Sequence, residues 1–444
     1  MNRSLRQVRF GYAAFLALTA AFSTPAPALA VTGCTGTPLS TTYFTWFDNA
    51  SPGMAQDNIH ILNPDGTATS SGCVTVSGYP GVSWTAAAGQ ETYLMLPAGT
   101  LGGPVQVTVN SGPPVKASQR VHLDQSFSEI WAVSAAQAVT TSYFNWYDKA
   151  SPSMYNDNVH LLNPGATSAT VTVSVPGANP QTATVGAGAQ AYVNFPQGSI
   201  GGPVTVTSSQ PVLASQRVQY NNSFSEVWAA SAAQAAATSY FSWYDSASPG
   251  MYIDNVHLLN PGTASANVTV SVHAWDPYPG GTQTVTVGAG AEVYVNFPGI
   301  NGGPVKVNVN SGPGVVASQR VRFYDSLKEF WSSGAALAST RSYFNWYDQY
   351  STGFYNDNIH VLNPGTVNAT ITVSIPYRST TIYVGPGAQY YVSWEVITGT
   401  HTCMVQHAPM CYPIGGPVVV SSDQPVLASQ RVQYYQSFNE VPAN

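Results

Sequence analysis

The chain has 444 residues and a formal net charge of −6, and only 8% of its residues are charged, against roughly 25% in ordinary soluble domains. It has no basic stripe, which argues against nucleic acid as a partner. Because aromatic and β-branched residues are plentiful, the composition is not that of a disordered chain, and the length allows several separate cores.

The first residues have the features of a secretory signal peptide, which we place at 1–30. Three arginines precede a short apolar run over 10–22, and the small-residue sequence "ALA" at 28–30 is a cleavage signal. The apolar run is too short to span a membrane, and no later stretch has 18 uninterrupted apolar residues. We therefore expect a secreted, extracellular and cell-surface-associated protein without a transmembrane anchor.

Four cysteines follow, at Cys34, Cys73, Cys403 and Cys411. In an exported chain an even number of cysteines indicates disulfides. The simplest pairing joins Cys34 to Cys73 and Cys403 to Cys411, although three connectivities are possible.

A unit of about 100 residues occurs four times. The motif "YFNWYDKASPSMYNDNVHLLNPG" begins at Tyr143, and near-copies begin at Tyr43, Tyr240 and Tyr343, at intervals of 100, 97 and 103 residues. A unit of this length can form a domain of its own. We predict domains at 31–131, 132–228, 229–331 and 332–444.

Within a unit the hydrophobic period is two, which predicts β-strands. In the second copy, three valines at 171–175 alternate with threonine and serine, and Gly, Pro and Asn clusters separate such segments. About seven short strands per unit are typical of an immunoglobulin-like β-sandwich. We predict an all-β protein of four tandem immunoglobulin-like β-sandwich domains, the last with a Cys-containing insertion at 396–413.

In the opening motif, strict alternation places Phe144 and Trp146 on one face and Tyr143, Asn145 and Tyr147 on the other. We predict that the tryptophan faces the core of its own unit and that the tyrosines face outward. The equivalent tryptophans are Trp46, Trp146, Trp243 and Trp346.

Outward tyrosines are candidates for stacking on a glycan or a protein partner. The alternative is ordinary cross-strand packing on a sheet with few charges. The binding candidates are Tyr147, Tyr155, Tyr244, Tyr252, Tyr347 and Tyr355.

A histidine recurs in the second strand of the motif, as His60, His160, His257 and His360. It could be a metal ligand or a general base. No second His or Cys accompanies it at ligand spacing, and no serine nucleophile recurs in a strained turn. We therefore interpret it as a structural histidine that is hydrogen-bonded to a loop.

Two aspartates lie nine residues apart in every copy: Asp48 and Asp57, Asp148 and Asp157, Asp245 and Asp254, Asp348 and Asp357. Paired carboxylates can cleave glycosides, and Asp148 and Asp157 are weak calcium candidates. Aspartate also caps turns through the backbone. We favour this last role and predict no metal and no other cofactor.

An arginine and a glutamate also recur nine residues apart: Arg120 and Glu129, Arg217 and Glu226, Arg320 and Glu329, Arg431 and Glu440. Variation at the residue two positions after the arginine indicates a solvated face. We predict Arg–Glu pairs at the sandwich edge, each worth about 0–1 kcal/mol if exposed.

The closing segments carry a resemblance to a known class of proteins. Each unit combines a "GGPV" turn with a signature such as "LASQRVQY…SFNEV" at 427–441. This combination resembles tandem β-sandwich repeat modules of secreted and cell-surface bacterial proteins, which are often of unassigned function. The resemblance covers residues 41–441, and it implies a β-sandwich fold, an extracellular location and no catalytic residues.

We therefore predict a secreted, non-catalytic structural, adhesive or binding protein of the cell surface. Its expected partner is a cell-wall or extracellular polysaccharide or another surface protein, and four similar faces would give avidity. The alternative is a lectin-like, glycan-binding protein that uses the outward tyrosines. A glycoside or peptide hydrolase ranks third.

Overall fold

The computed structural model describes residue 34, residues 36–394 and residues 414–444. Over these residues the chain is almost entirely β-strand, and its helices are three single 3-10 turns, η1 (Ala135–Gln137), η2 (Ala232–Gln234) and η3 (Ala335–Leu337). None of these described helices has the length and apolar character needed to cross a membrane. The all-β prediction is confirmed, whereas the predicted signal peptide and the 396–413 insertion lie outside the described residues.

The first two repeats, called unit 1 and unit 2, have closely matching strands. Unit 1 contains β1 (Ser40–Phe44), β2 (Phe47–Asp48), β3 (Met54–Leu62), β4 (Ser70–Val76), β5 (Val82–Ala86), β6 (Glu91–Met95), β7 (Leu101–Gly102), β8 (Val105–Ser111), β9 (Lys116–Leu123), β10 (Ser126–Trp131) and β11 (Val133–Ser134). Unit 2 contains β12 (Val139–Phe144), β13 (Tyr147–Asp148), β14 (Met154–Leu162), β15 (Ala169–Ser174), β16 (Gln181–Val185), β17 (Gln190–Asn194), β18 (Ile200–Gly201), β19 (Val204–Tyr220) and β20 (Ser223–Trp228).

Units 3 and 4 repeat this order. Unit 3 contains β21 (Thr238–Phe241), β22 (Tyr244–Asp245), β23 (Met251–Leu259), β24 (Ala266–Ala274), β25 (Gly281–Val287), β26 (Glu292–Asn296), β27 (Asn301–Ser311), β28 (Val316–Phe323), β29 (Ser326–Trp331) and β30 (Ser333–Gly334). Unit 4 contains β31 (Ser339–Phe344), β32 (Tyr347–Asp348), β33 (Phe354–Leu362), β34 (Ala369–Ile375), β35 (Arg378–Val384), β36 (Gln389–Val392), β37 (Ile414–Gly415), β38 (Val418–Tyr434) and β39 (Ser437–Pro442).

Each unit packs two antiparallel sheets face to face. In unit 1 the outer sheet has the order β11-β1-β8-β4-β5, and the inner sheet has the order β10-β9-β3-β6. In unit 2 the long strand β19 continues from one sheet into the other. Val171 and Val173 from the outer sheet meet Val159 and Leu161 from the inner sheet in one core. The period-two valines therefore form the core, as the alternation predicts.

The segment that leaves each unit pairs with the first strand of that same unit. Val133 and Ser134 pair with β1, and Ala230 forms a bridge to Tyr143 in unit 2. In unit 4 the last residue, Asn444, exchanges two backbone hydrogen bonds with Tyr343. The first sheet of units 1, 2 and 3 therefore extends a few residues beyond the predicted domain ends.

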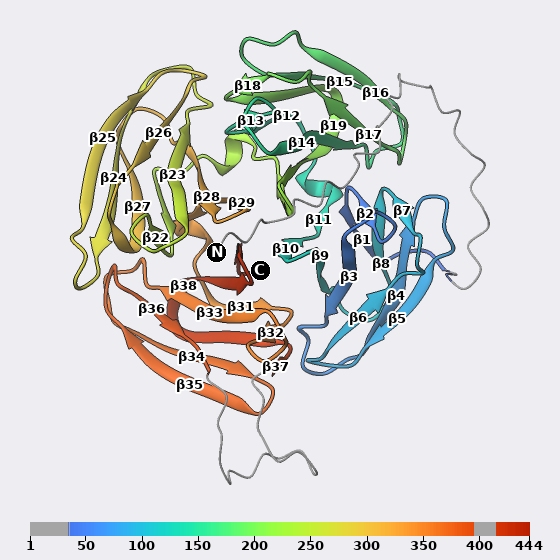
Figure 1. Ribbon diagram of the computed structural model, residues 1–444. Helices are drawn as coiled ribbons and strands as arrows, with labels where there is room; N and C mark the ends of the chain where they lie inside the picture. The colour runs from blue at the N-terminus through green and yellow to red at the C-terminus, as the bar shows by residue number, and fades with distance from the viewer. Residues whose placement is uncertain (1–33, 35, 395–413) are drawn as a thin grey trace, which may run out of the picture.

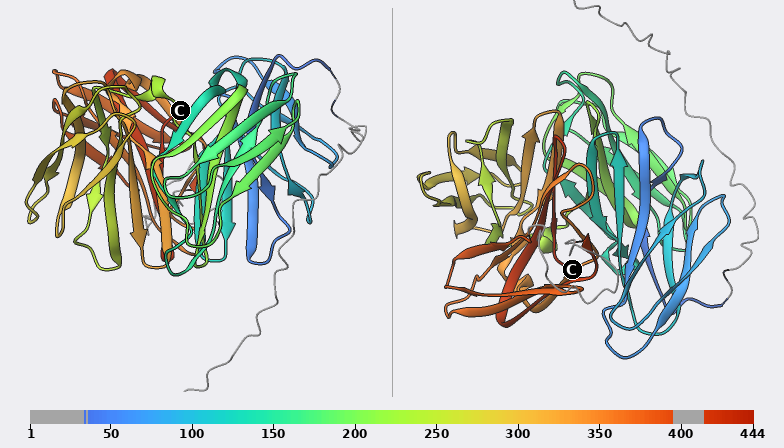
Figure 2. Two further views of the ribbon diagram at one scale, coloured as in Figure 1. Left: turned by 90° about the horizontal axis from the view of Figure 1, so that it is seen from above. Right: turned by 60° about the horizontal axis from the view of Figure 1, so that its bottom comes forward.

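The four units form a closed ring (Figure 1), which the two turned views also show (Figure 2). The strands β10, β20, β29 and β39 meet at the centre, where each contacts the next and β39 contacts β10. Closure between units 4 and 1 includes a hydrogen bond from Trp131 Nε1 to the Pro442 carbonyl oxygen, at 2.8 Å. The repeats therefore pack directly against one another.

A disulfide joins Cys34 to Cys73 at the start of unit 1. This bond confirms half of the predicted pairing. Cys403 and Cys411 lie outside the described residues, so their pairing stays a prediction.

The structure corrects the predicted faces of the opening motif. The first strand of unit 2 ends at Phe144, a bend follows at Asn145 and Trp146, and the next strand starts at Tyr147. This bend interrupts the alternation, so Phe144 and Tyr147 both point into the core and are 0% exposed. The prediction that the tryptophans of this motif fill the core of their own unit is wrong. These side chains, Trp46, Trp146, Trp243 and Trp346, are only partly buried.

Three of the tyrosines proposed for binding are consequently buried. Tyr147, Tyr244 and Tyr347 are 0% exposed and cannot form a binding surface. The Tyr147 hydroxyl instead donates to the Asp157 carbonyl oxygen at 2.5 Å and accepts from the Phe195 amide at 3.1 Å. Two such buried hydrogen bonds to backbone groups stabilise the core by roughly 1 kcal/mol each.

The second glycine of each "GGPV" turn explains why that turn recurs together with the bend. A Cβ atom on Gly202 would lie 1.9 Å from the Asn145 carbonyl oxygen, and one on Gly103 would lie 2.0 Å from the Thr45 carbonyl oxygen. Only glycine allows the turn to pack this closely on the bend.

We expect Gly202→Ala to destabilise the ring by about 1–3 kcal/mol or more, because the added methyl group displaces the bend at Asn145. Thermal unfolding followed by circular dichroism measures the effect. The matched control is Gly186→Ala, whose added Cβ would make an ordinary 3.6 Å contact with Ala189. Equal melting temperatures for the two variants would contradict this account of the motif.

Candidate functional site

The four junctions between units are built by the same residues of the repeat. The bend of one unit directs its tryptophan onto the inner sheet of the next unit, where it packs against the recurrent histidine. The ring centroids are 5.5 Å apart for Trp46 and His160, 5.8 Å for Trp146 and His257, 6.0 Å for Trp243 and His360, and 6.0 Å for Trp346 and His60. The last pair closes the ring.

On its other side each histidine contacts a tyrosine of the edge strand in its own unit. His160 stacks on Tyr192 at 5.6 Å, and its Nδ1 lies 2.9 Å from Gln190 Nε2. His60 Nδ1 similarly lies 2.7 Å from Glu91 Oε1. In units 1, 2 and 3 the histidine is therefore a hydrogen-bonded structural residue, and its partner lies on a neighbouring strand instead of a loop.

Burial keeps these imidazoles neutral. It lowers the pKa of His60, His160 and His360 well below the usual range, and a nearby arginine of the same unit lowers it further. A neutral imidazole can pack between two aromatic rings at little electrostatic cost.

The predicted Arg–Glu pairs form in all four units. The nitrogen–oxygen distances are 3.2 Å for Arg120 and Glu129, 3.5 Å for Arg217 and Glu226, 3.3 Å for Arg320 and Glu329, and 3.4 Å for Arg431 and Glu440. The predicted solvated face is wrong, because side chains of these pairs are at most 11% exposed. The neighbouring unit covers them.

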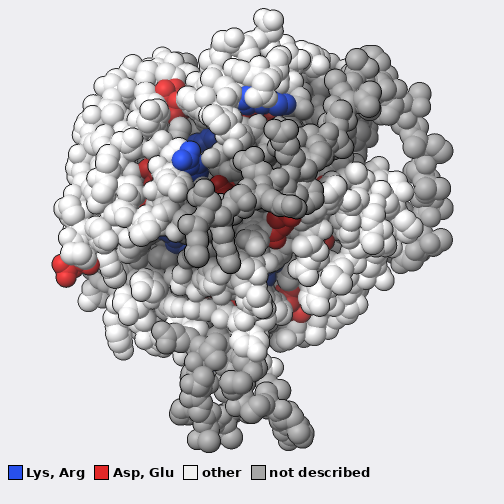
Figure 3. Space-filling view, viewed as in Figure 1, with Lys and Arg blue, Asp and Glu red and all other residues white. Residues whose placement is uncertain are grey.

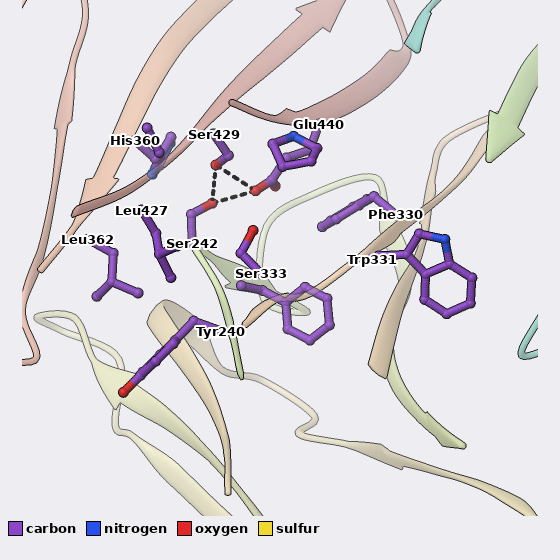
Figure 4. A pocket seen from close by; sticks show the side chains of 13 residues that line it. Tyr240, Ser242, Phe330, Trp331, Ser333, His360, Leu362, Leu427, Ser429 and Glu440 are labelled. Atoms are coloured by element: carbon purple, nitrogen blue, oxygen red, sulfur yellow. Dashed lines mark hydrogen bonds between the residues drawn. The ribbon is translucent and has the colours of Figure 1, made fainter. Parts of the chain in front are cut away.

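Small polar side chains from the preceding unit complete each buried pair. At the junction of units 3 and 4, the Ser242 hydroxyl donates to Glu440 Oε1 at 2.5 Å, and Ser429 Oγ lies 2.9 Å from Ser242 Oγ and 2.8 Å from Glu440 Oε1 (Figure 4). This triangle of oxygen atoms lines a small cavity of about 30 Å³.

The same arrangement at the other junctions indicates a structural role. Between units 1 and 2, Thr45 takes the place of Ser242 and donates to Glu226 at 2.8 Å. Between units 2 and 3, Asn145 donates to Ser318 Oγ at 2.7 Å instead. Because serine, threonine and asparagine all occupy this position, no particular nucleophile is needed there.

The two recurrent aspartates hold the loop that follows the bend. Asp157 Oδ2 accepts from the Asp148 amide at 2.7 Å, and Asp148 Oδ1 accepts from the amides of Ala150 and Ser151 at 3.0 and 2.8 Å. Burial raises the pKa of Asp157 to about 7. Their oxygens are thus engaged by backbone donors, as loop stapling requires. Among the described residues no group of three His, Cys, Asp or Glu side chains could hold a metal ion.

The centre of the ring contains a lysine that sequence reasoning missed. Lys328 is 2% exposed and donates to the Phe224 carbonyl oxygen of unit 2. Burial lowers the pKa of its ammonium well below the usual value. Ser128, Ser225 and Asn439 occupy the equivalent positions, so the lysine is particular to unit 3.

Several tyrosines reach solvent, in agreement with part of the prediction. Tyr155, Tyr252 and Tyr355 are 54%, 59% and 57% exposed. A second recurrent set lies on the edge strands, where Tyr93, Tyr192, Tyr294 and Tyr391 are 52%, 55%, 53% and 39% exposed. Few charged side chains reach the face that Figure 3 shows. The exposed surface therefore offers mainly neutral polar and aromatic groups.

Comparisons with known proteins give little guidance. No protein-family model matches the sequence, and none of the curated proteins is significantly similar to it. Among solved structures, the chain matches one described as a tetra-tandem repeat in the extending region of a large adhesion protein, at 12% identity over 89% of this chain and 93% of that one. The TM-score of that match is 0.10, which is too low to carry any conclusion about fold or function.

We expect Glu226→Gln to destabilise the ring by about 3–5 kcal/mol, because it leaves the buried Arg217 guanidinium without a counter-charge. The double variant Arg217→Met/Glu226→Gln should recover part of this loss. Urea unfolding monitored by tryptophan fluorescence measures both. The control is exposed Lys306→Met, with an effect within about 0.5 kcal/mol. A double variant less stable than the single variant would contradict the pairing.

The buried histidines should make the ring sensitive to acid. Their pKa values are lower in the folded protein than in the unfolded chain, so the unfolded state binds more protons below pH about 6.5 and stability falls as the pH drops. In the triple variant His60→Gln/His160→Gln/His360→Gln, we expect the melting temperature to depend less on pH between about 5 and 7.

Exposed His273 provides the control, because His273→Gln should leave the pH profile unchanged. Asp57, Asp157 and Asp254 act in the opposite sense. Because their pKa is raised to about 7 in the folded protein, they make the folded protein less stable as the pH rises. The difference between variant and parent isolates the histidine contribution. If the melting temperature of the triple variant depends on pH as steeply as that of the parent, the histidine contribution is refuted.

Proposed function

We propose that the protein is a secreted, non-catalytic adhesive or binding protein whose ring presents a similar uncharged surface on each of its four units. The observation that carries this proposal is the distribution of charges and tyrosines. The recurrent Arg–Glu pairs are buried in the junctions, whereas tyrosines recur at exposed positions in the repeats.

An uncharged extracellular polysaccharide is the partner class that fits this surface best. The face of a tyrosine ring packs against the C–H groups of a sugar, and its hydroxyl bonds to sugar hydroxyls. A charged polymer would find few ionic partners on a chain in which 8% of residues are charged. Repetition adds avidity, because a polymer that contacts several units binds more tightly than one that contacts a single unit.

Two observations support an extracellular location. The first 30 residues have signal-peptide features, and the described part of the chain contains a disulfide between Cys34 and Cys73, as is usual in oxidising compartments. The two-sheet units, each with its own core, support the immunoglobulin-like assignment as part of the same proposal.

A non-catalytic role is supported by the way the recurrent polar residues are used. The aspartates that could act as an acid–base pair accept backbone hydrogen bonds. The glutamates are paired with arginines, and the histidines are packed between aromatic rings. Each recurrent polar group is explained by a contact that holds a loop or a junction.

We expect the protein to bind insoluble neutral cell-wall polysaccharide saturably and with little dependence on salt, because stacking on sugars is not ionic. The triple variant Tyr155→Ser/Tyr252→Ser/Tyr355→Ser should bind about tenfold more weakly, because three exposed rings are lost. A sedimentation pull-down in low and high salt measures both effects.

Tyr383→Ser serves as the control, because Tyr383 is 79% exposed and unit 2 has Thr184 at the equivalent position. Its binding should equal that of the parent. Binding that high salt abolishes, or equal binding by the triple variant and the parent, would refute the tyrosine-based mechanism.

A further inference from the structure

One aromatic residue that is not part of the shared repeat, Trp275, lies at the junction of units 3 and 4, and a second, Tyr390, adjoins it through Tyr391. Trp275 follows β24 in unit 3, in a connection that contains the insertion-like sequence "AWDPYPGG". Tyr390 lies on β36 of unit 4, where the equivalent residues of the other units are Thr92, Ala191 and Val293. Unit 3 thus contributes one additional ring to its boundary with unit 4, where Trp275 meets the recurrent Tyr391.

Trp275 joins two of the recurrent aromatic residues in one surface. Trp275 lies 5.2 Å from Trp243 and 6.5 Å from Tyr391, measured between ring centroids. Tyr391 in turn stacks on Tyr390 at 6.2 Å with an interplanar angle of 24°. Trp275, Tyr390 and Tyr391 are 41%, 49% and 39% exposed. Exposed apolar area gathered in one place marks a binding surface more often than scattered residues do.

The surface is held in place before any ligand arrives. Trp243 Nε1 donates to Asn301 Oδ1 at 2.8 Å. The backbone groups of Trp275 and Tyr278 bond to each other and close the connection. Tyr391 packs on His360 at 5.5 Å. A preformed surface loses little conformational entropy when it binds.

An open cleft adjoins this surface. Trp243, His360 and Tyr391 also line a cleft of about 440 Å³ between units 3 and 4, which is within the range of small-ligand sites. Asn356 and Gln433 line it as well and are bonded to each other at 2.9 Å. The cleft therefore combines aromatic walls with amide groups that can bond to hydroxyl groups.

The charged groups of the cleft already have partners within the protein. Asp245 accepts from the amides of Ala247 and Ser248, and Arg431 is paired with Glu440 at 3.4 Å. A neutral ligand rich in hydroxyl groups can therefore enter the cleft without disturbing the ion pair.

We propose that the junction of units 3 and 4 is a binding site for a neutral oligosaccharide. One sugar ring stacks on Trp275 and Tyr391, and the chain extends into the cleft, where its hydroxyl groups bond to Asn356 and Gln433. This inference rests on the proposed function for its ligand class. It goes further by assigning one defined site that the other three junctions lack.

The test uses the full chain and soluble neutral hexasaccharides of glucose, xylose, mannose and N-acetylglucosamine. We expect at least one of them to quench tryptophan fluorescence saturably and to release heat in calorimetry. Trp275→Ala should weaken this binding about tenfold, as expected for a central aromatic anchor. The same change should leave the melting temperature nearly unchanged, because Trp275 is 41% exposed.

The matched control is Tyr192→Ala, which removes the equivalent of Tyr391 at the junction of units 1 and 2 and should leave hexasaccharide binding unchanged. If no hexasaccharide binds, or if Trp275→Ala binds as the parent does, the site is refuted. Binding of a neutral proline-rich peptide without binding of any sugar would refute it as well.

The insoluble-polysaccharide pull-down separates this failure from failure of the proposed function. Tyrosine-dependent binding of the polymer together with no hexasaccharide binding overturns the site alone. Loss of both overturns the proposed function as well.

Discussion

The ring depends on one local constraint, the bend between the first two strands of each unit. At the bend the chain leaves the extended conformation for two residues, Asn145 and Trp146 in unit 2, and the tryptophan turns away from its own core. The second glycine of the "GGPV" turn fixes the bend, because no larger residue fits against the carbonyl oxygen of Asn145. A tryptophan directed outward then needs a partner, and the inner sheet of the next unit provides a histidine. When four units are arranged in this way, the last tryptophan meets the first histidine and the ring closes.

Closure also explains how a chain so poor in charge uses the charges it has. The Arg–Glu pairs lie on inner sheets that would be solvated in an isolated unit, and the neighbouring unit buries them. A buried ion pair adds little net stability compared with apolar residues of the same shape. A buried charge that lacks its partner, however, strongly destabilises the folded protein. Placing the pairs at every junction therefore penalises wrong alignment of the units. Phenylalanine rings on the guanidinium groups, such as Phe224 on Arg217 at 4.7 Å, and hydroxyl groups on the carboxylates fix their orientation further.

The sequence alone correctly predicted the features that depend on short-range patterns. Alternation of Val and Thr predicted the strands, spacing predicted the Arg–Glu pairs, and an even cysteine count predicted the Cys34–Cys73 bond. Prediction from the sequence failed where the alternation was interrupted, and where a neighbouring unit of the same chain covers a face of the sheet. Alternation across Asn145 and Trp146 assigned Tyr147 to the surface, although the bend turns it inward. The face that carries Arg217 varies in sequence as a solvated face does, yet it is covered by the preceding unit. Local periodicity contains no information about how units meet around an axis.

Repetition and its exceptions have different physical meanings in this molecule. Residues that must match around the ring, such as the bend glycine, the histidine and the ion pair, recur in all units because a single mismatch would open a junction. A residue free of that constraint can differ in one unit without cost to closure. Trp275 and Tyr390 are such residues: neither takes part in the contacts shared by the four junctions, and both leave large apolar rings in water, which costs roughly 25 cal/mol for each Å² of apolar surface left exposed. Stability does not account for this exposure, whereas contact with a ligand would remove it.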